Sequence, residues 1–350
     1  MNSRRCARMI LAGVTILCAL GAMAPLALPA FAQPDPAMPL VERIDLVGIV
    51  VDDLDRSLAF YTQVLPFTVV NVDEVWGDPW EQLRGTFGLR MRVAILAIGQ
   101  ERIELIDYLT PESAVIPRDS RSNDVWFQHI AIVVSDMDAA YARLRKHGVR
   151  HGSTGPQTLP AWNPSAGGIE AFYFKDPDGH VLEVIHFPEG KGDPRWQQSD
   201  DLFLGIDHTA IVVEDTEASL AFYRDTLGLC VVGESENYGP EQERLNNVFG
   251  ARVRITSLRA RGGGPAIELL EYLAPGTGRP IPENASRTDL ASWHVRAAAT
   301  RLDAAPASMR LVSPVVVEIP DVKGPTRAIS VMDPDGHVIE LVDEQGVGAP

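Results

Sequence analysis

Residues 207–230, DHTAIVVEDTEASLAFYRDTLGLC, nearly repeat residues 45–68, DLVGIVVDDLDRSLAFYTQVLPFT, at a constant offset of 162 positions. Each copy has the pattern of an apolar strand followed by an amphipathic helix, which is expected over 55–64 in the first copy. The repeat predicts a duplicated scaffold. One difference between the copies concerns chemistry: His208 takes the place of Leu46, and an imidazole can bind a metal ion whereas a leucine side chain cannot.

The strand–helix pattern occurs twice more. Residues 127–134 (FQHIAIVV) begin a third copy, which continues into the helix-like DMDAAYARLRKHG, and Trp293-His294-Val295 begins the most divergent copy. The helix of this divergent copy is expected around 297–307. It should be short or poorly formed, because it is Ala-rich and contains Pro306.

The second and fourth copies along the chain end in the same motif. DPDGH occupies 176–180 and 333–337, where Pro and Gly favour a tight turn, and an alternating strand follows each turn. His180 and His337 are therefore interpreted mainly as residues that flank a turn. The whole pattern predicts an α+β fold built from four βαβββ units.

Chain length suggests how the units are grouped. A chain of 350 residues exceeds one ordinary core. We expect a first domain over 41–189, a linker over 190–201 and a second domain over 202–345. The linker segment is polar, contains Gly and Pro, and shows no apolar period.

The first 32 residues have the features of a secretory signal peptide. Three arginines precede an apolar run over 9–28, and Ala30-Phe31-Ala32 fits an A-x-A cleavage site. A retained membrane anchor is the competing interpretation, disfavoured because no charged stop follows. Cleavage would leave 28 basic and 47 acidic residues, a formal charge of −19. Such a surface argues against nucleic acid and anionic membrane as partners and is typical of a soluble exported protein, periplasmic or secreted.

The four units, the Phe-Tyr pair in the first helix of each half and the two DPDGH strands resemble the vicinal oxygen chelate superfamily. This group includes glyoxalase I, methylmalonyl-CoA epimerase, extradiol dioxygenases and the fosfomycin and bleomycin resistance proteins. The resemblance covers residues 43–344. It implies that units pair into two cupped mixed sheets, with metal ligands projecting into each cup from the first and last strands of each unit.

Carried over position by position, the resemblance implies one complete metal site in the second half, formed by His208, Glu268, His294 and Glu340. The first half offers a possible second site of Glu104, His129 and Glu183, with Leu46 in the place of the fourth ligand. Two imidazoles and two carboxylates suit a divalent ion, whether zinc, nickel, cobalt, manganese or iron.

Which of these residues share a metal site depends on which units pair. Units one and two could pair, as could units three and four, and this arrangement gives the sets above. If unit one pairs with unit four and unit two with unit three, the complete site is His129, Glu183, His208 and Glu268. Both arrangements predict one four-ligand site and one site that lacks a histidine.

The resemblance implies a metal-dependent lyase or isomerase of the glyoxalase or epimerase type, which stabilises an enediolate or enolate of a small oxygenated substrate. Glu340 or Glu268 would act as the base. A dioxygenase is the alternative enzyme, disfavoured because residues 261–265 lack the expected His and residues 329–332 the expected Tyr. A non-catalytic binding protein of the bleomycin-resistance type is a further alternative.

A second repeated segment supplies candidate substrate contacts. Arg252 and Arg254 share a strand face and could bind a substrate carboxylate, although solvated arginines are an equally good interpretation. Asn246 replaces Arg84 of the first copy, which suggests that the two cups bind different things. Tyr272 and Trp293 could wall the site. The expected partner is a small molecule, and a homodimer is left open.

Overall fold

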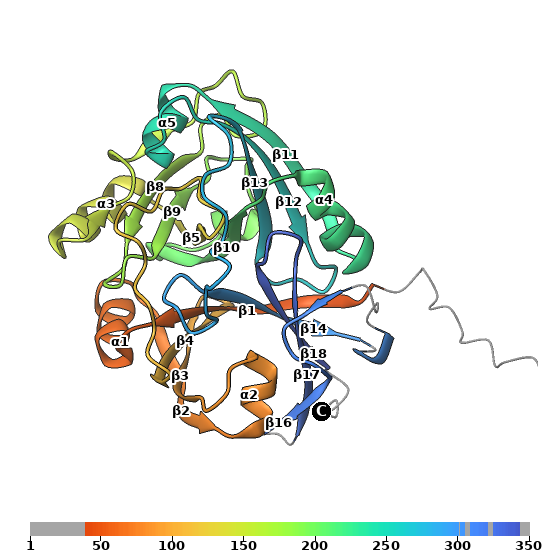
Figure 1. Cartoon of the computed structure of the whole chain (residues 1–350). Helices are drawn as coiled ribbons and strands as arrows, with labels where there is room; N and C mark the ends of the chain where they lie inside the picture. Colours follow the sequence, from red (N-terminus) through yellow and green to blue (C-terminus); the bar gives the residue numbers. More distant parts are fainter. Residues whose placement is uncertain (1–38, 301, 305–308, 321–324, 344–350) are drawn as a thin grey trace, which may run out of the picture. The chain divides into compact units, whose positions relative to one another are not determined.

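The computed structural model describes residues 39–300, 302–304, 309–320 and 325–343, so the expected signal segment lies outside the described residues. These residues form two mixed sheets of nine strands each. In Figure 1 the orange and blue strands make one sheet, and the yellow-green and teal strands make the other. Each sheet therefore combines strands from both halves of the sequence. Within the described part of the chain, no helix is long and apolar enough to span a membrane.

Sheet A is built from units one and four. Its strands, in spatial order, are β15 (Arg310–Leu311), β17 (Thr326–Met332), β18 (Val338–Asp343), β14 (Trp293–Ala299), β1 (Val41–Val51), β4 (Glu101–Thr110), β3 (Arg90–Ile98) and β2 (Thr68–Trp76), and β16 (Val317–Ile319) pairs with β17.

Sheet B is built from units two and three. Its strands, in spatial order, are β11 (Cys230–Tyr238), β12 (Arg252–Arg259), β13 (Ala266–Ala274), β10 (Phe203–Val212), β5 (Gln128–Val134), β9 (Val181–His186), β8 (Glu170–Lys175) and β6 (Arg150–His151), and β7 (Gln157–Thr158) pairs with β8.

In each sheet, the first strands of its two units pair with each other at the centre. β1 runs antiparallel to β14 and parallel to β4, and β10 runs antiparallel to β5 and parallel to β13. This is the second of the two unit pairings that the sequence left open.

Helices from different units complete two apolar cores. α1 (Leu54–Gln63) and α3 (Met137–Lys146) belong to units one and two, and α4 (Thr216–Leu220) continues into a π-helical turn over Ala221–Thr226 in unit three. Each of these helices begins at an aspartate whose carboxylate accepts a hydrogen bond from a backbone N–H of the first turn, as expected for an N-cap. One core joins mainly units one and two, and another joins mainly units three and four. The cores thus hold each half of the sequence together, whereas the sheets cross between the halves.

Among the described residues of the expected helix of unit four, only a 3₁₀ turn is helical. β14 continues to Ala299, and the described part of the following segment is a 3₁₀ turn over Leu302–Ala304. The small alanine side chains fit the buried strand, and all three of Ala297, Ala298 and Ala299 are at most 1% exposed. Residues 301 and 305–308 lie outside the described residues.

The second repeated segment begins within a short helix in each copy. α2 (Asp78–Arg84) packs Leu83 against β16 and β17, and α5 (Pro240–Asn246) is bound to unit two through Ser153, whose hydroxyl donates to the Leu245 carbonyl at 2.7 Å. Each helix ends one residue before a left-handed residue, Gly85 or Asn247. The last residues of the two helices, Arg84 and Asn246, are both buried.

Candidate metal centre

The centre of sheet B brings together four side chains that could bind a metal ion, and we call His129, Glu183, His208 and Glu268 site B. The strand register explains the convergence. Ala210 of β10 lies opposite both His129 of β5 and Glu268 of β13, and Ala131 of β5 lies opposite both His208 and Glu183. Four strands thus place four side chains around one point.

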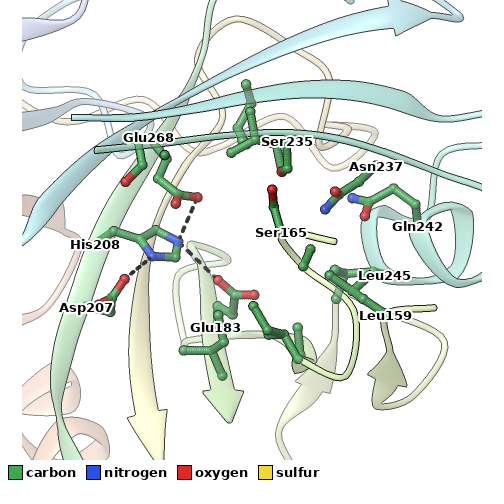
Figure 2. Close-up of a pocket in the computed structure, with 18 of the residues that line it drawn as sticks. Leu159, Ser165, Glu183, Asp207, His208, Ser235, Asn237, Gln242, Leu245 and Glu268 are labelled. Carbon is green, nitrogen blue, oxygen red and sulfur yellow. Dashed lines mark hydrogen bonds and ion pairs between the residues drawn. The ribbon is translucent and has the colours of Figure 1, made fainter. Parts of the chain in front are cut away.

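Glu183 lies between the two imidazoles. Its Oε2 is 3.1 Å from Nε2 of His129 and 3.5 Å from Nε2 of His208. The same His208 nitrogen is 3.4 Å from Oε2 of Glu268. Figure 2 shows His208 with its contacts to both glutamates.

The other nitrogen of His208 is held by its neighbour in sequence. Nδ1 lies 3.1 Å from Oδ2 of Asp207, and Asp207 is itself bound by Arg259 at 2.7 Å and by the Trp196 indole at 3.2 Å. Adjacent strand residues normally point to opposite faces, but the β10–β5 register shifts between Ile206 and His208. This bulge allows Asp207 to reach the ring. A donated Nδ1–H leaves Nε2 available as a metal ligand.

The donor set fits a divalent ion. Ligand atoms bound about 2.1 Å from one ion lie about 3 Å apart, close to the spacing of the site B donor atoms. One ligand atom from each of His129, Glu183 and His208 lies within 4.8 Å of the other two. Nδ1 of His129 is buried without a hydrogen-bond partner, so its ring is held by packing against Tyr173, with ring centroids 4.9 Å apart.

The carboxylates of site B favour a positive charge between them. Burial alone would raise the pKa of Glu183, but hydrogen bonds from His129 and His208 lower it to about 2. Burial opposes protonation of His208, yet the surrounding carboxylates, first that of Glu268, raise its pKa well above the ordinary value. Burial raises the pKa of Glu268. A group of carboxylates that holds one imidazole protonated will also attract a metal cation.

A cavity of about 190 Å³ opens beside site B. His129, Glu183, His208 and Glu268 line one side, and Figure 2 shows a second polar group, Ser165, Ser235, Asn237 and Gln242, across the cavity. Leu159, Leu245 and Ile255 are among its apolar walls. The arrangement can hold an ion at one side of a small polar substrate.

The structure does not bring the second-half ligand set together. His208 and Glu268 lie in sheet B, whereas His294 and Glu340 lie in sheet A with Glu104 and Leu46; we call these last four residues site A. The possible first-half set is divided in the same way, since Glu104 is in sheet A and His129 and Glu183 are in sheet B. The reason is the pairing of β1 with β14 and of β10 with β5.

The expected substrate residues lie mostly away from the cavity. Arg252 and Arg254 are bound at the surface to Glu236 and Glu217, at 2.6 and 2.8 Å, and neither lines the cavity. Tyr272 is buried in an apolar cluster of sheet B. Trp293 packs edge-on against His180 and lines a different cavity. Asn246 is buried and accepts a hydrogen bond from Gln242, so it supports a cavity residue.

Sequence reasoning missed residues that line the cavity or support its lining. Tyr173 of β8 lies opposite Glu183 and precedes the 176–180 turn, as Ser330 precedes the equivalent turn of sheet A. Because unit two completes site B, the strand to inspect for a tyrosine was β8 rather than β17. Trp196 comes from the expected linker, where a 3₁₀ turn (Pro194–Gln197) buries it beside Asp207. Its apolar bulk within a polar segment was the available signal.

Comparison with known proteins gives consistent matches. The model of the Glyoxalase/Bleomycin resistance protein/Dioxygenase superfamily matches residues 43–184 and 205–341. A 2-epi-5-epi-valiolone epimerase of Actinomyces sp is 35% identical over 153 residues, which cover 41% of this chain and 79% of the epimerase. Catechol-2,3-dioxygenase of Bacillus subtilis (strain 168) is 27% identical over 211 residues, which cover 55% of this chain and 66% of the dioxygenase. The crystal structure of glyoxalase I from Zea mays superimposes with a TM-score of 0.57 at 18% identity, covers 87% of this chain and 93% of its own, and shows the same fold.

Proposed function

Because the chain belongs to the glyoxalase/bleomycin resistance protein/dioxygenase superfamily, we propose that it is an exported, metal-dependent lyase or isomerase of the glyoxalase or epimerase type. The observation that carries the proposal is the convergence of two imidazoles and two carboxylates on one small cavity in sheet B. The similarity to an epimerase supports this reaction class.

His129, His208 and Glu183 would hold the divalent ion, with Glu268 as a fourth ligand or as the base. A bound ion would polarise two neighbouring substrate oxygens and so acidify the C–H beside a carbonyl. Glu268 suits proton transfer, because its side chain is 20% exposed beside the cavity and burial raises its pKa. Asp207 orients His208 and takes no proton from substrate.

The cavity indicates a small, hydroxylated substrate. Its volume of about 190 Å³ is below the roughly 300–1,000 Å³ of pockets for drug-sized ligands. Gln242 is 2% exposed, and its side-chain oxygen has no hydrogen-bond partner. Together with Ser165 and Ser235 it can bind substrate hydroxyl groups on the side facing Glu268.

Deuterium exchange tests the proposed chemistry. Incubation of a panel of α-hydroxy aldehydes and ketones in D₂O should introduce deuterium at the carbon beside the carbonyl, measured by NMR. Glu268→Gln should retain metal and lose most of the exchange, about 10²-fold or more for removal of a catalytic base. His208→Leu should lose the metal itself. Full exchange by Glu268→Gln would rule out its role as the base, and ligand binding without exchange across the panel would favour a non-catalytic binding protein.

A ring-cleaving dioxygenase is the second candidate, and Tyr173 is the observation that favours it. The structure supplies near site B the tyrosine that the sequence of unit four lacks, although no third histidine lines the described cavity. Two histidines and one glutamate also suit iron(II). Iron in the purified protein together with oxygen uptake on catechols would replace the lyase proposal; nickel, zinc, cobalt or manganese without oxygen uptake would support it.

Export is a separate part of the proposal and rests on the sequence of residues 1–32. Expression in a bacterium followed by N-terminal sequencing of the periplasmic protein should give a chain that begins at Gln33. Retention of the full-length chain in the membrane fraction would instead support an anchor.

A further inference from the structure

Site A occupies the same strand positions as site B, but an arginine lies at its centre. Nη2 of Arg84 is 3.0 Å from Oε2 of Glu104 and 3.4 Å from Oε2 of Glu340. Its Nη1 is 3.1 Å from Nδ1 of His294. The guanidinium thus contacts all three side chains that could serve as metal ligands, and it is buried. In sheet B the equivalent residue is Asn246, which carries no charge.

A second arginine accompanies the missing histidine. Arg296 of β14 lies opposite Leu46 of β1, whereas Ala131 lies opposite His208 in sheet B. Nη2 of Arg296 is 3.0 Å from Oε1 of Glu104, and its Nε is 2.7 Å from Oε1 of Glu340. Each of the two carboxylates therefore directs one oxygen to each guanidinium. Relative to sheet B, sheet A thus has Leu in place of His on one central strand and Arg in place of Ala on the strand beside it.

Site A is electrically balanced without an ion. Two buried carboxylates face two guanidinium cations. A neutral His294 satisfies its own neighbours, because Nδ1 can accept from Arg84 and Nε2 can donate to Glu104, at 3.1 Å each. The open space beside Arg84 and His294 is about 20 Å³, compared with about 190 Å³ beside site B. An entering metal ion would have to displace a buried arginine from both carboxylates and leave it unpaired, which is strongly unfavourable.

We propose that Arg84 takes the place of the metal ion in site A, with Arg296 as the second cation, so that the chain binds a single divalent ion, at site B. Site A is then a metal-independent ionic cluster that joins α2 to β4, β14 and β18. Sheet A has no part in the proposed reaction, so the role of Arg84 does not depend on the chemistry that site B performs.

Titration of the chelated full-length protein with Co²⁺ tests this, because the visible absorption of bound cobalt counts ligated ions. Wild type should bind one equivalent, His208→Leu none, and Glu104→Gln still one. Leu46→His alone should remain at one equivalent, because Arg84 and Arg296 still occupy the site. The triple variant Leu46→His, Arg84→Asn, Arg296→Ala copies the residues of sheet B and should bind two.

Three results would overturn the proposal. One is a wild type that binds two equivalents and loses one on Glu104→Gln, and another is a gain of a second equivalent by Leu46→His alone. The third is a triple variant that is folded by circular dichroism but gains no equivalent over wild type. If the triple variant does not fold, the wild-type, Glu104→Gln and Leu46→His counts decide the matter. A wild type without bound cobalt and a triple variant with one equivalent would contradict the metal assignment of site B but support the proposal for site A.

Discussion

At the scale of single residues, the two sites require different neighbours on their central strands. The ring of His294 lies across Gly48, so that a Cβ added at Gly48 would come within 1.8 Å of the ring. The equivalent residue of sheet B is Ala210, which lies opposite His129 in the same register. The imidazole of site A is therefore placed differently from that of site B, in a position that only a glycine permits.

This contact predicts that Gly48→Ala destabilises the protein. The ring must move and lose its contact with Arg84, and overpacking of this kind costs about 1–3 kcal/mol. The free energy of unfolding from urea titration measures the loss. Ala210→Gly is the matched control at the equivalent position and should cost less, about 0.5–1 kcal/mol, because only strand propensity and a methyl group change. Equal losses in the two variants would contradict the proposed packing of His294.

At the scale of elements, the ends of α2 and α5 show how one backbone form accepts two sequences. The residue after α2 is Gly85, with φ 64°, and the residue after α5 is Asn247, with φ 53°. Asparagine is one of the few side chains that tolerate the left-handed region. The same turn thus presents Arg84 to site A and Asn246 to the cavity residue Gln242.

A pair of substitutions at Asn247 tests this turn. Asn247→Gly should leave stability within about 0.5 kcal/mol of wild type, because glycine adopts positive φ freely. Asn247→Ala should lose about 1 kcal/mol, because its Cβ is strained there. Thermal and urea unfolding of the two variants provide the comparison. An alanine variant as stable as the glycine variant would show that the turn is not held left-handed in solution.

The elements were predictable from sequence, but their partners were not. Periodicity and the DPDGH turns identified the units because each unit repeats the same local signals. The pairing of β1 with β14 depends on contacts between strands that are apolar in every unit, so their sequences carry little information about the partner. The sequence accordingly offered two groupings of the candidate ligands, and the choice of the one that joins His208 to His129 required the sheet. The role of Arg84 was hidden for the same reason, since its partners Glu104, His294 and Glu340 come from both ends of the chain.

At the scale of the whole described unit, the two DPDGH turns connect the sheets to each other. His180, in the turn before β9 of sheet B, lies 2.7 Å from the carbonyl oxygen of Leu290, which precedes β14 of sheet A. His337, in the turn before β18 of sheet A, lies 2.9 Å from the carbonyl oxygen of Val125, which precedes β5 of sheet B. Each of these histidines therefore flanks a turn in one sheet, as expected, and also contacts a backbone carbonyl next to the other sheet.

Both turn histidines are hydrogen-bonded as cations. Nδ1 of His180 is 2.8 Å from Oδ2 of Asp176, and Nδ1 of His337 is 2.8 Å from Oδ2 of Asp333. Carboxylate and carbonyl oxygens only accept, so each ring must donate from both nitrogens. Burial disfavours the charge, but the paired aspartate, with the next aspartate of each turn, raises the pKa of each histidine above 6.5. Oδ1 of each paired aspartate accepts backbone N–H groups, so these clusters are closed turns rather than open metal sites.

This arrangement predicts a loss of stability as the pH rises. A histidine whose pKa is higher in the folded than in the unfolded protein contributes its full stabilisation below the unfolded value of about 6.5, and the contribution disappears as the pH rises through the folded value. The free energy of unfolding of metal-free protein should therefore decrease from pH 6.5 upward. The double variant His180→Gln, His337→Gln should show a smaller decrease. His208, whose pKa is also raised, is retained in both proteins, so the difference between the two pH profiles isolates the turn histidines. Parallel profiles would show that these two rings are not bound as cations.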